Sequence, residues 1–111
     1  MKKDANMFLD HIRDSIAVIE DAIKGKSFEE FVNSIVTQDC VVRRIEIIGE
    51  AANNLPEDFQ KEHPEIAWRK IVGMRNILAH EYFGVDLKVV WDTAVNKIPV
   101  LKEELSKLKY E

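Results

Sequence analysis

The sequence predicts an all-α protein, an antiparallel four-helix bundle with one additional short helix, in one domain that spans residues 1–111. Three observations lead to this fold class. Apolar residues recur at spacings of three and four through most of the chain, which is the period of an amphipathic helix. No stretch alternates apolar and polar residues as a strand does. Glycine and proline fall between the periodic stretches, so the helices should follow one another through short loops.

The first amphipathic stretch runs from Asp4 to Lys24 and should end at Gly25. Ser27 followed by Glu30 has the form of a capping box, so a short second helix is expected to begin there. The residues that should face inward are Phe8, Ile12, Ile16, Ile19 and Ile23 in the first helix, and Phe28, Phe31, Val32 and Ile35 in the second.

A third helix is expected over about residues 38–55, after the pattern restarts at Thr37 and Asp39. Its core face should consist of Val41, Val42, Ile45, Ile48, Ala51 and Ala52. Gly49 and the two alanines have little or no side chain, so another helix should approach closely there. Pro56 should stop this helix, because proline donates no backbone hydrogen bond and disfavours helix in the residue before it.

Residues 56–63 are expected to form a connector with a turn or two of helix around Phe59. Pro64 fits the first turn of the next helix. That helix should end near Tyr82 or Phe83, with Gly84 as its stop. Its apolar side carries Ile66, Ala67, Ile71, Met74, Ile77 and Leu78, and its polar side carries Arg69, Gly73, Asn76 and His80. Gly73 costs about 1 kcal/mol in mid-helix relative to alanine, which suggests close approach by a ligand or another chain.

Asp86 should cap a last helix, from Leu87 to about Lys107. Its inward stripe should be Val90, Trp91, Ala94, Val95, Ile98, Leu101, Leu105 and Leu108. Pro99 lies inside this stretch, so a kink or a broken hydrogen bond is expected there.

Composition limits the class of protein. The chain is 46% hydrophobic and 32% charged, as in a soluble globular protein, and no apolar run approaches the ~20 residues that span a bilayer. With no signal-peptide pattern at the N-terminus, a cytoplasmic protein is expected. The net charge of −4 argues against coating nucleic acid through a broad basic surface, but leaves room for a small RNA site. Cys40, the single cysteine, should be a half-buried helix residue, and no metal or cofactor is predicted.

Chemistry-bearing residues gather in one stretch, Gly73-Met74-Arg75-Asn76-Ile77-Leu78-Ala79-His80-Glu81-Tyr82. On a helix, Asn76 and His80 lie about 40° apart and share a face, whereas Arg75 lies about 140° from His80 and reaches it only through its long side chain. A permanent cation, an amide and a group that titrates near neutral pH are what a phosphodiester-cleaving site uses. The alternative is an arginine and a histidine on the solvated side of an amphipathic helix.

Two further groups have a structural interpretation. Arg43, Glu46 and Glu50 lie at i, i+3 and i+7 on one stripe of the third helix. We interpret them as a surface ion-pair ladder worth a few tenths of a kcal/mol per pair, with a catalytic role as the alternative. Trp68, Trp91 and Phe8 are expected in the core.

These residues make the sequence resemble the HEPN superfamily and, within it, the HepT-like ribonuclease toxins. The resemblance rests on Arg75-Asn76-Ile77-Leu78-Ala79-His80-Glu81-Tyr82, which looks like the family's signature of Arg, four residues, His, one residue and Tyr. Two upstream segments support it, Arg43-Arg44-Ile45-Glu46-Ile47-Ile48-Gly49-Glu50-Ala51 and Trp68-Arg69-Lys70-Ile71-Val72-Gly73-Met74. Helix order and length agree over nearly the whole chain, which therefore resembles a single HEPN-like helical domain.

The resemblance implies a metal-independent endoribonuclease toxin of a type II/VII-like toxin–antitoxin pair. It would work as a homodimer whose two Arg-x4-His motifs face one another across a cleft. His80 would take the 2′-hydroxyl proton or protonate the leaving oxygen, Arg75 would stabilise the charge of the transition state, and Asn76 would orient the substrate or His80. Since the 2′-oxygen would be the nucleophile, RNA would be cut and DNA spared.

The resemblance also implies a partner, a cognate MntA-like nucleotidyltransferase antitoxin that transfers AMP to Tyr82. A bulky anion two residues from His80 would fill and repel at a site made for phosphate. Tyr82 can also be an aromatic residue that packs at the helix end, and the two roles are compatible. A second class of function stays open, a non-catalytic helical partner that binds and positions a nucleotidyltransferase.

Overall fold

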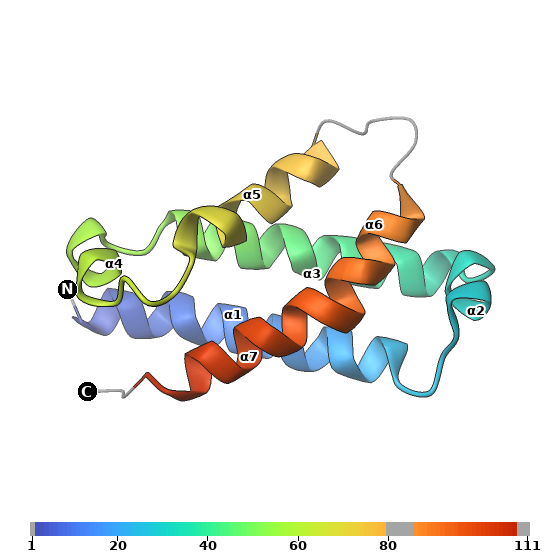
Figure 1. The fold of residues 1–111 in the computed structure, drawn as a ribbon, viewed down its shortest axis with the longest axis horizontal. Helices are drawn as coiled ribbons and strands as arrows, with labels where there is room; N and C mark the ends of the chain where they lie inside the picture. The colour runs from blue at the N-terminus through green and yellow to red at the C-terminus, as the bar shows by residue number, and fades with distance from the viewer. Residues whose placement is uncertain (1, 80–85, 109–111) are drawn as a thin grey trace.

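The computed structural model describes residues 2–79 and 86–108, and the side chains of residues 5–75 and 86–108. Every regular element in these ranges is helical, which confirms the all-α prediction. α1 and α3 are antiparallel neighbours, α5 packs on α3, and the C-terminal helix contacts both α1 and α3 (Figure 1). The elements are α1 (Lys2–Ile23), α2 (Phe28–Val32), α3 (Ile35–Asn53), α4 (Glu57–Glu62), α5 (Trp68–Ala79), α6 (Leu87–Asp92), the π-helical η1 (Thr93–Lys97) and α7 (Ile98–Ser106).

Four long segments therefore form the bundle, because α6, η1 and α7 follow one another without a break. The short α2 was expected, and α4 is the turn or two of helix expected around Phe59. One apolar core holds the bundle together. Its completely buried apolar side chains are Ile12, Ile19, Phe31, Val41, Ile48, Ala52 and Ile98, drawn from α1, α2, α3 and the C-terminal helix. Trp68 is buried and Phe8 and Trp91 pack against this core, as predicted.

The turn between α1 and α2 follows the sequence prediction closely. Gly25 has φ of 72°, a left-handed conformation that glycine adopts without steric cost. Ser27 then caps α2: the Glu30 backbone N–H donates to Ser27 Oγ at 3.1 Å, and the Ser27 N–H donates to Glu30 Oε1 at 2.9 Å. The bonds from Ser27 hold the pKa of Glu30 below its usual value. The predicted capping box is confirmed.

The start of α3 differs from the prediction. The helix begins at Ile35 because Ser34 serves as its N-cap and accepts from the Thr37 N–H at 3.2 Å. This earlier start turns Ile35 outward, and its side chain is 71% exposed. Val32 is also exposed, so the expectation that Val32 and Ile35 face inward is wrong. Phe31 is buried and Phe28 half-buried, as expected.

The start of α5 also differs, because Pro64 lies in a turn and the helix begins only at Trp68. Trp68 anchors this turn: its buried indole donates from Nε1 to the His63 carbonyl at 3.0 Å. The Trp68 backbone N–H donates to the Ile66 carbonyl at 2.9 Å. Hydrogen bonds within residues 63–68 thus replace the helical turn expected at Pro64.

The last helix shows how the chain accommodates Pro99. Asp86 caps it as predicted, accepting at Oδ1 from the backbone N–H groups of Lys88 and Val89. The π-helical turn Thr93–Lys97 comes directly before Ile98 and Pro99. Proline has no N–H, and its ring collides with the carbonyl four residues earlier, so a wider turn relieves both problems. The disturbance expected at Pro99 is confirmed as this turn.

Candidate active site

Arg75 is the one residue of the predicted site whose side chain the structure describes. It lies on α5 one position after the buried Met74, so its side chain leaves the core at the edge facing α3. Its Nη1 donates to Glu50 Oε2 at 2.7 Å, and the Arg75 side chain is 31% exposed. The carboxylate holds one end of the guanidinium, while the other N–H groups of the planar fork stay available for a ligand.

Gly49 allows this contact between the helices. A Cβ built on Gly49 would lie 2.6 Å from Cβ of Arg75, closer than carbon atoms pack, and 3.2 Å from the Arg75 backbone nitrogen, which is tighter than an ordinary contact. α3 and α5 therefore approach one another at a position that only glycine permits, which confirms the close approach expected at Gly49. The same approach brings the next residue, Glu50, within reach of Arg75.

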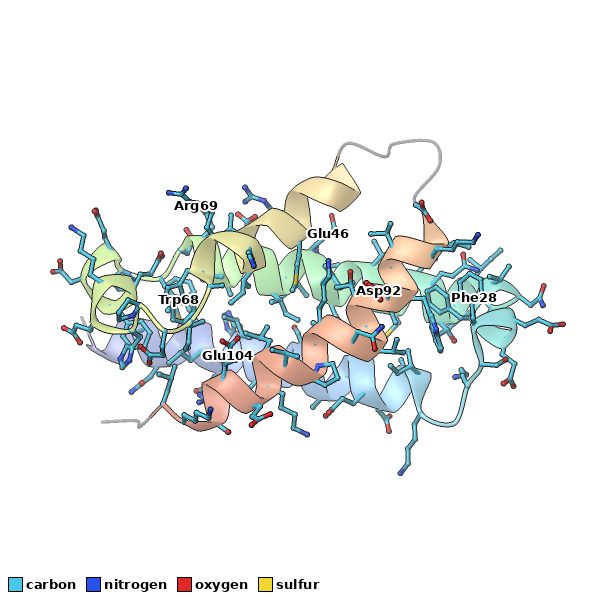
Figure 2. The ribbon with its side chains drawn as sticks, in the orientation of Figure 1. Phe28, Glu46, Trp68, Arg69, Asp92 and Glu104 are labelled. Carbon is cyan, nitrogen blue, oxygen red and sulfur yellow. The ribbon has the colours of Figure 1, made fainter. Side chains whose placement is uncertain are left out.

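An open pocket of about 290 Å³ lies beside this ion pair. Its lining comes from α1, α3 with its C-cap, and α5, and consists of Phe8, His11, Arg43, Glu46, Ile47, Glu50, Ala51, Asn54 and Arg75. Glu46 projects from the middle of α3 (Figure 2). The pocket combines two guanidinium groups, two carboxylates, an amide and an imidazole above an apolar floor.

The polar groups of the pocket differ in how they are bound. Asn54 Nδ2 donates to the Glu50 carbonyl at 2.9 Å. The side chains of Arg43 and Glu46 form no ion pair or hydrogen bond with the described residues. The rings of Phe8 and His11 meet edge to face with their centroids 6.3 Å apart. Several groups of the pocket therefore remain open to a ligand.

The interpretation of Arg43, Glu46 and Glu50 as an ion-pair ladder along α3 is wrong. Glu50 pairs across the helices with Arg75, and the other two residues form no ladder among the described residues. The helices lie so close at Gly49 that Glu50 meets a cation on α5 more readily than one on its own helix. All three residues line the pocket, and the alternative of a catalytic role stays a prediction.

Other predicted site residues lie wholly or partly outside the described residues. The backbone of Asn76 belongs to α5, and its side chain is outside the described ranges. His80 and Tyr82 lie in residues 80–85, which the structure does not describe. The roles of Asn76, His80 and Tyr82 therefore stay predictions.

Sequence reasoning missed Phe8, His11 and Asn54 as parts of this site. The strongest signal available was Gly49, the glycine of the third helix, because a residue without a side chain marks where a neighbouring helix passes. His11 gave no signal, because apart from Phe8 the nearest pocket residue in the sequence is Arg43, 32 positions further on. His11 joins the site only through packing of α1 on α3.

The described residues contain no group of three or more His, Cys, Asp and Glu side chains that could hold a metal ion. Among these residues no helix combines the length and apolar character needed to cross a bilayer. Cys40 is free and half-buried, as predicted.

The fold and the site define a helical-bundle protein with a charged pocket built around an arginine. Residues 12–108 match the family model described as "Ribonuclease HepT-like". The chain belongs to this HepT-like ribonuclease family and is thus an enzyme of the endoribonuclease class.

Individual relatives agree with the family. "Probable ribonuclease HepT" of Thermococcus cleftensis is 44% identical over 109 residues, which cover 98% of this chain and 99% of that protein. A "Putative RNase" of Caldanaerobacter subterraneus subsp. tengcongensis is 40% identical, over 96% of this chain and 95% of that protein. "Gamma-glutamylcyclotransferase and putative RNase" of Methanocaldococcus jannaschii is 46% identical over the whole chain, which spans 50% of its length. No solved structure matches.

Proposed function

We propose that the chain is a metal-independent endoribonuclease toxin that cleaves RNA through Arg75 and His80. The observation that carries this proposal is the setting of Arg75. Its guanidinium is fixed by Glu50 at 2.7 Å, beside an open pocket, in a chain of a ribonuclease family. A fixed cation with free N–H groups suits the negative charge that develops on phosphate during cleavage.

In the proposed reaction, the 2′-oxygen of a nucleotide attacks the adjacent phosphorus and the bond from phosphorus to the 5′-oxygen breaks. The products are a 2′,3′-cyclic phosphate and a free 5′-hydroxyl. One proton leaves the 2′-hydroxyl and one is added to the 5′-oxygen, and His80 performs one of these transfers. Arg75 stabilises the charge of the five-coordinate transition state, and Asn76 orients the substrate or His80.

A homodimer completes the proposed site, since one motif offers few cationic groups and one histidine. If two motifs face one another, one histidine takes the proton and the other supplies it. The open space at Gly73 supports this arrangement, because a Cβ built there meets no atom within 4 Å among the described residues. Gly73 also lines a second hollow, of about 610 Å³, between α5 and the C-terminal helix.

We also propose that a nucleotidyltransferase antitoxin controls the enzyme by AMP transfer to Tyr82. The tyrosine hydroxyl attacks the α-phosphate of ATP, and pyrophosphate leaves. The new phosphodiester anion stands two residues from His80, where it repels and displaces substrate phosphate. Support comes from the sequence position of Tyr82 and from the family to which the chain belongs.

Incubation of purified protein with single-stranded RNA in EDTA tests the proposal. We expect fragments ending in a 2′,3′-cyclic phosphate, seen by mass spectrometry, and no cleavage of DNA with the same sequence. Cleavage that requires an added metal would contradict metal independence. If RNA stays intact under all conditions, the alternative function is favoured, in which the protein is a non-catalytic partner of a nucleotidyltransferase.

A further inference from the structure

In the pocket beside Arg75, several side-chain oxygens that can accept a hydrogen bond have no donor among the described residues. Glu50 uses Oε2 for Arg75, which leaves Oε1. Glu46 has no hydrogen bond or ion pair among the described residues, so both its oxygens can accept. Asn54 spends its Nδ2 on the Glu50 carbonyl and keeps its side-chain oxygen as an acceptor. A ligand that fills this pocket should therefore present N–H donors.

The charge of the pocket also selects the ligand. Arg43 and Arg75 supply two positive charges, and Glu46 and Glu50 supply two negative ones. A phosphate inside the pocket would meet carboxylates as well as guanidinium groups. Repulsion by the carboxylates would largely cancel attraction by the guanidinium groups, so the net electrostatic stabilisation would be small. A neutral, polar group with separate donor and acceptor edges fits this arrangement better.

Guanine has such edges. Its N1–H and N2–H₂ are neighbouring donors that a single carboxylate accepts together, whereas adenine and cytosine present one donor beside an acceptor. Its O6 and N7 are neighbouring acceptors that an arginine guanidinium binds in a bidentate way. The carboxylate of Glu46 suits the two donors, and the guanidinium of the exposed Arg43 suits the two acceptors. These residues lie on adjacent turns of α3.

The size and the walls of the pocket suit one base. Its volume of about 290 Å³ lies at the lower end of small-molecule sites, which range over ~300–1,000 Å³. His11 is exposed and stands with Phe8 on the α1 side of the pocket. Aromatic rings of this kind stack on the unpaired bases of single-stranded RNA while polar groups read the base edges.

We infer that this pocket is a guanine-binding subsite, in which Glu46 accepts from N1–H and N2–H₂ and Arg43 donates to O6 and N7. The inference rests on the proposed ribonuclease function, because it places the base of a nucleotide next to the phosphate that Arg75 contacts. The enzyme then prefers to cut RNA beside guanosine.

Cleavage of chimeric oligonucleotides tests the subsite. In each, one nucleotide keeps its 2′-hydroxyl and the others are 2′-O-methylated, so only one bond can break. The bases on both sides of that bond are varied in turn among guanine, hypoxanthine, adenine, cytosine and uracil. We expect guanine at one of the two positions to be cut about tenfold faster than adenine or more. Hypoxanthine, which lacks the N2 amine, should fall between them.

The variant Glu46→Gln gives the decisive comparison, because glutamine can no longer accept from both N–H groups. Its preference for guanine over adenine should fall to about twofold or less, because the guanine substrate loses a contact that the adenine substrate never makes. Glu103→Gln, on the exposed side of α7, is the matched control and should keep the full preference. Equal rates for guanine and adenine at both positions, or an unchanged preference in Glu46→Gln, overturn the inference.

Binding measurements separate failure of the subsite from failure of the ribonuclease proposal. We expect calorimetry to give guanosine monophosphate about tenfold tighter binding than adenosine monophosphate, and equal binding of both to Glu46→Gln. If this pattern holds but no RNA is cut, the pocket stands and the nuclease proposal fails. If RNA is cut without base preference and neither nucleotide is favoured, the nuclease stands and the subsite fails.

Discussion

Arg75 shows how a surface side chain acquires a fixed position. A free arginine on a helix samples many rotamers, and ordering its side chain has an entropic cost of up to about 2 kcal/mol. Here Glu50 binds the guanidinium at 2.7 Å, so the Arg75 side chain is already partly ordered before substrate binds. Because the pair is partly exposed, it contributes less than about 1 kcal/mol to folding. Its main consequence is therefore orientation.

Replacement of Arg75 by lysine tests this view. Lysine keeps the charge, but a single ammonium cannot bind Glu50 and a phosphate as a planar fork does. We expect Arg75→Lys to lower the rate of RNA cleavage about a hundredfold, a loss typical of a missing transition-state donor. Its melting temperature should fall by no more than about 5 °C. Wild-type cleavage by Arg75→Lys would mean that charge alone is needed.

Tyr82 allows a separate test of control. Neither proposed catalytic role requires its hydroxyl, so Tyr82→Phe should keep its fold and most of its cleavage activity. The phenylalanine has no oxygen to accept AMP, and the variant should resist a modifying nucleotidyltransferase. Intact-mass analysis after incubation with the partner and ATP decides the matter. Equal AMP addition to both proteins, or none to the parent, would leave Tyr82 as a packing residue.

At the scale of the helices, the contact of α3 with α5 determines where the site lies. Gly49 sets the distance between these helices, and that distance places Glu50 beside Arg75. The π-helical turn before Pro99 is a second irregular feature, and α7 continues along the bundle after it. Gly49 thus determines how closely α3 and α5 pack, and Pro99 determines where the last helix departs from α-helical geometry.

Gly49→Ala tests the role of the close contact. The new methyl group would collide with Cβ and the backbone of Arg75, and neither can move aside without shifting α5. We expect a loss of roughly 1–3 kcal/mol in the free energy of unfolding, measured by urea denaturation of dilute protein, together with slower RNA cleavage. Gly73→Ala is the matched control for the stability measurement alone, and in dilute protein it should instead gain up to about 1 kcal/mol from better helix propensity. Unchanged stability in Gly49→Ala would show that the helices are not tightly packed there.

At the scale of the whole molecule, the amphipathic pattern was sufficient to predict the bundle. Stripes such as Ile12 with Ile19, and Ile98 with Leu105, lie in the core as expected. Ser27, Glu30 and Asp86 identified helix starts because capping depends on residues close in sequence. Local signals of this kind specify most of the fold.

The errors arose where a choice depended on packing or on competing caps. Thr37 and Asp39 suggested that the helix starts near them. Ser34 is the N-cap instead, so α3 begins earlier, at Ile35. The pair of Glu50 and Arg75 joins residues 25 positions apart, so no helical period reveals it. The pocket has the same origin, since α1, α3 and α5 form it only after they pack.

The proposed dimer is also a property of the whole molecule. Light scattering at micromolar concentration should give about twice the chain mass of 12.8 kDa. Gly73→Ala, although it suits the helix, should weaken the dimer, because an added methyl group would stand where the partner approaches. A fully active monomer, or a Gly73→Ala dimer as tight as the parent, would contradict the placement of the dimer axis.

The rate of RNA cleavage by His80→Ala, beside that of Arg75→Ala, tests the central claim most directly. Both variants should have the parent's helical circular dichroism, and both should cut RNA about a hundredfold more slowly or not at all. Lys24→Ala, which removes an exposed positive charge just after α1, should cut within about twofold of the parent rate. A His80→Ala protein that cuts RNA as fast as the parent would contradict the account.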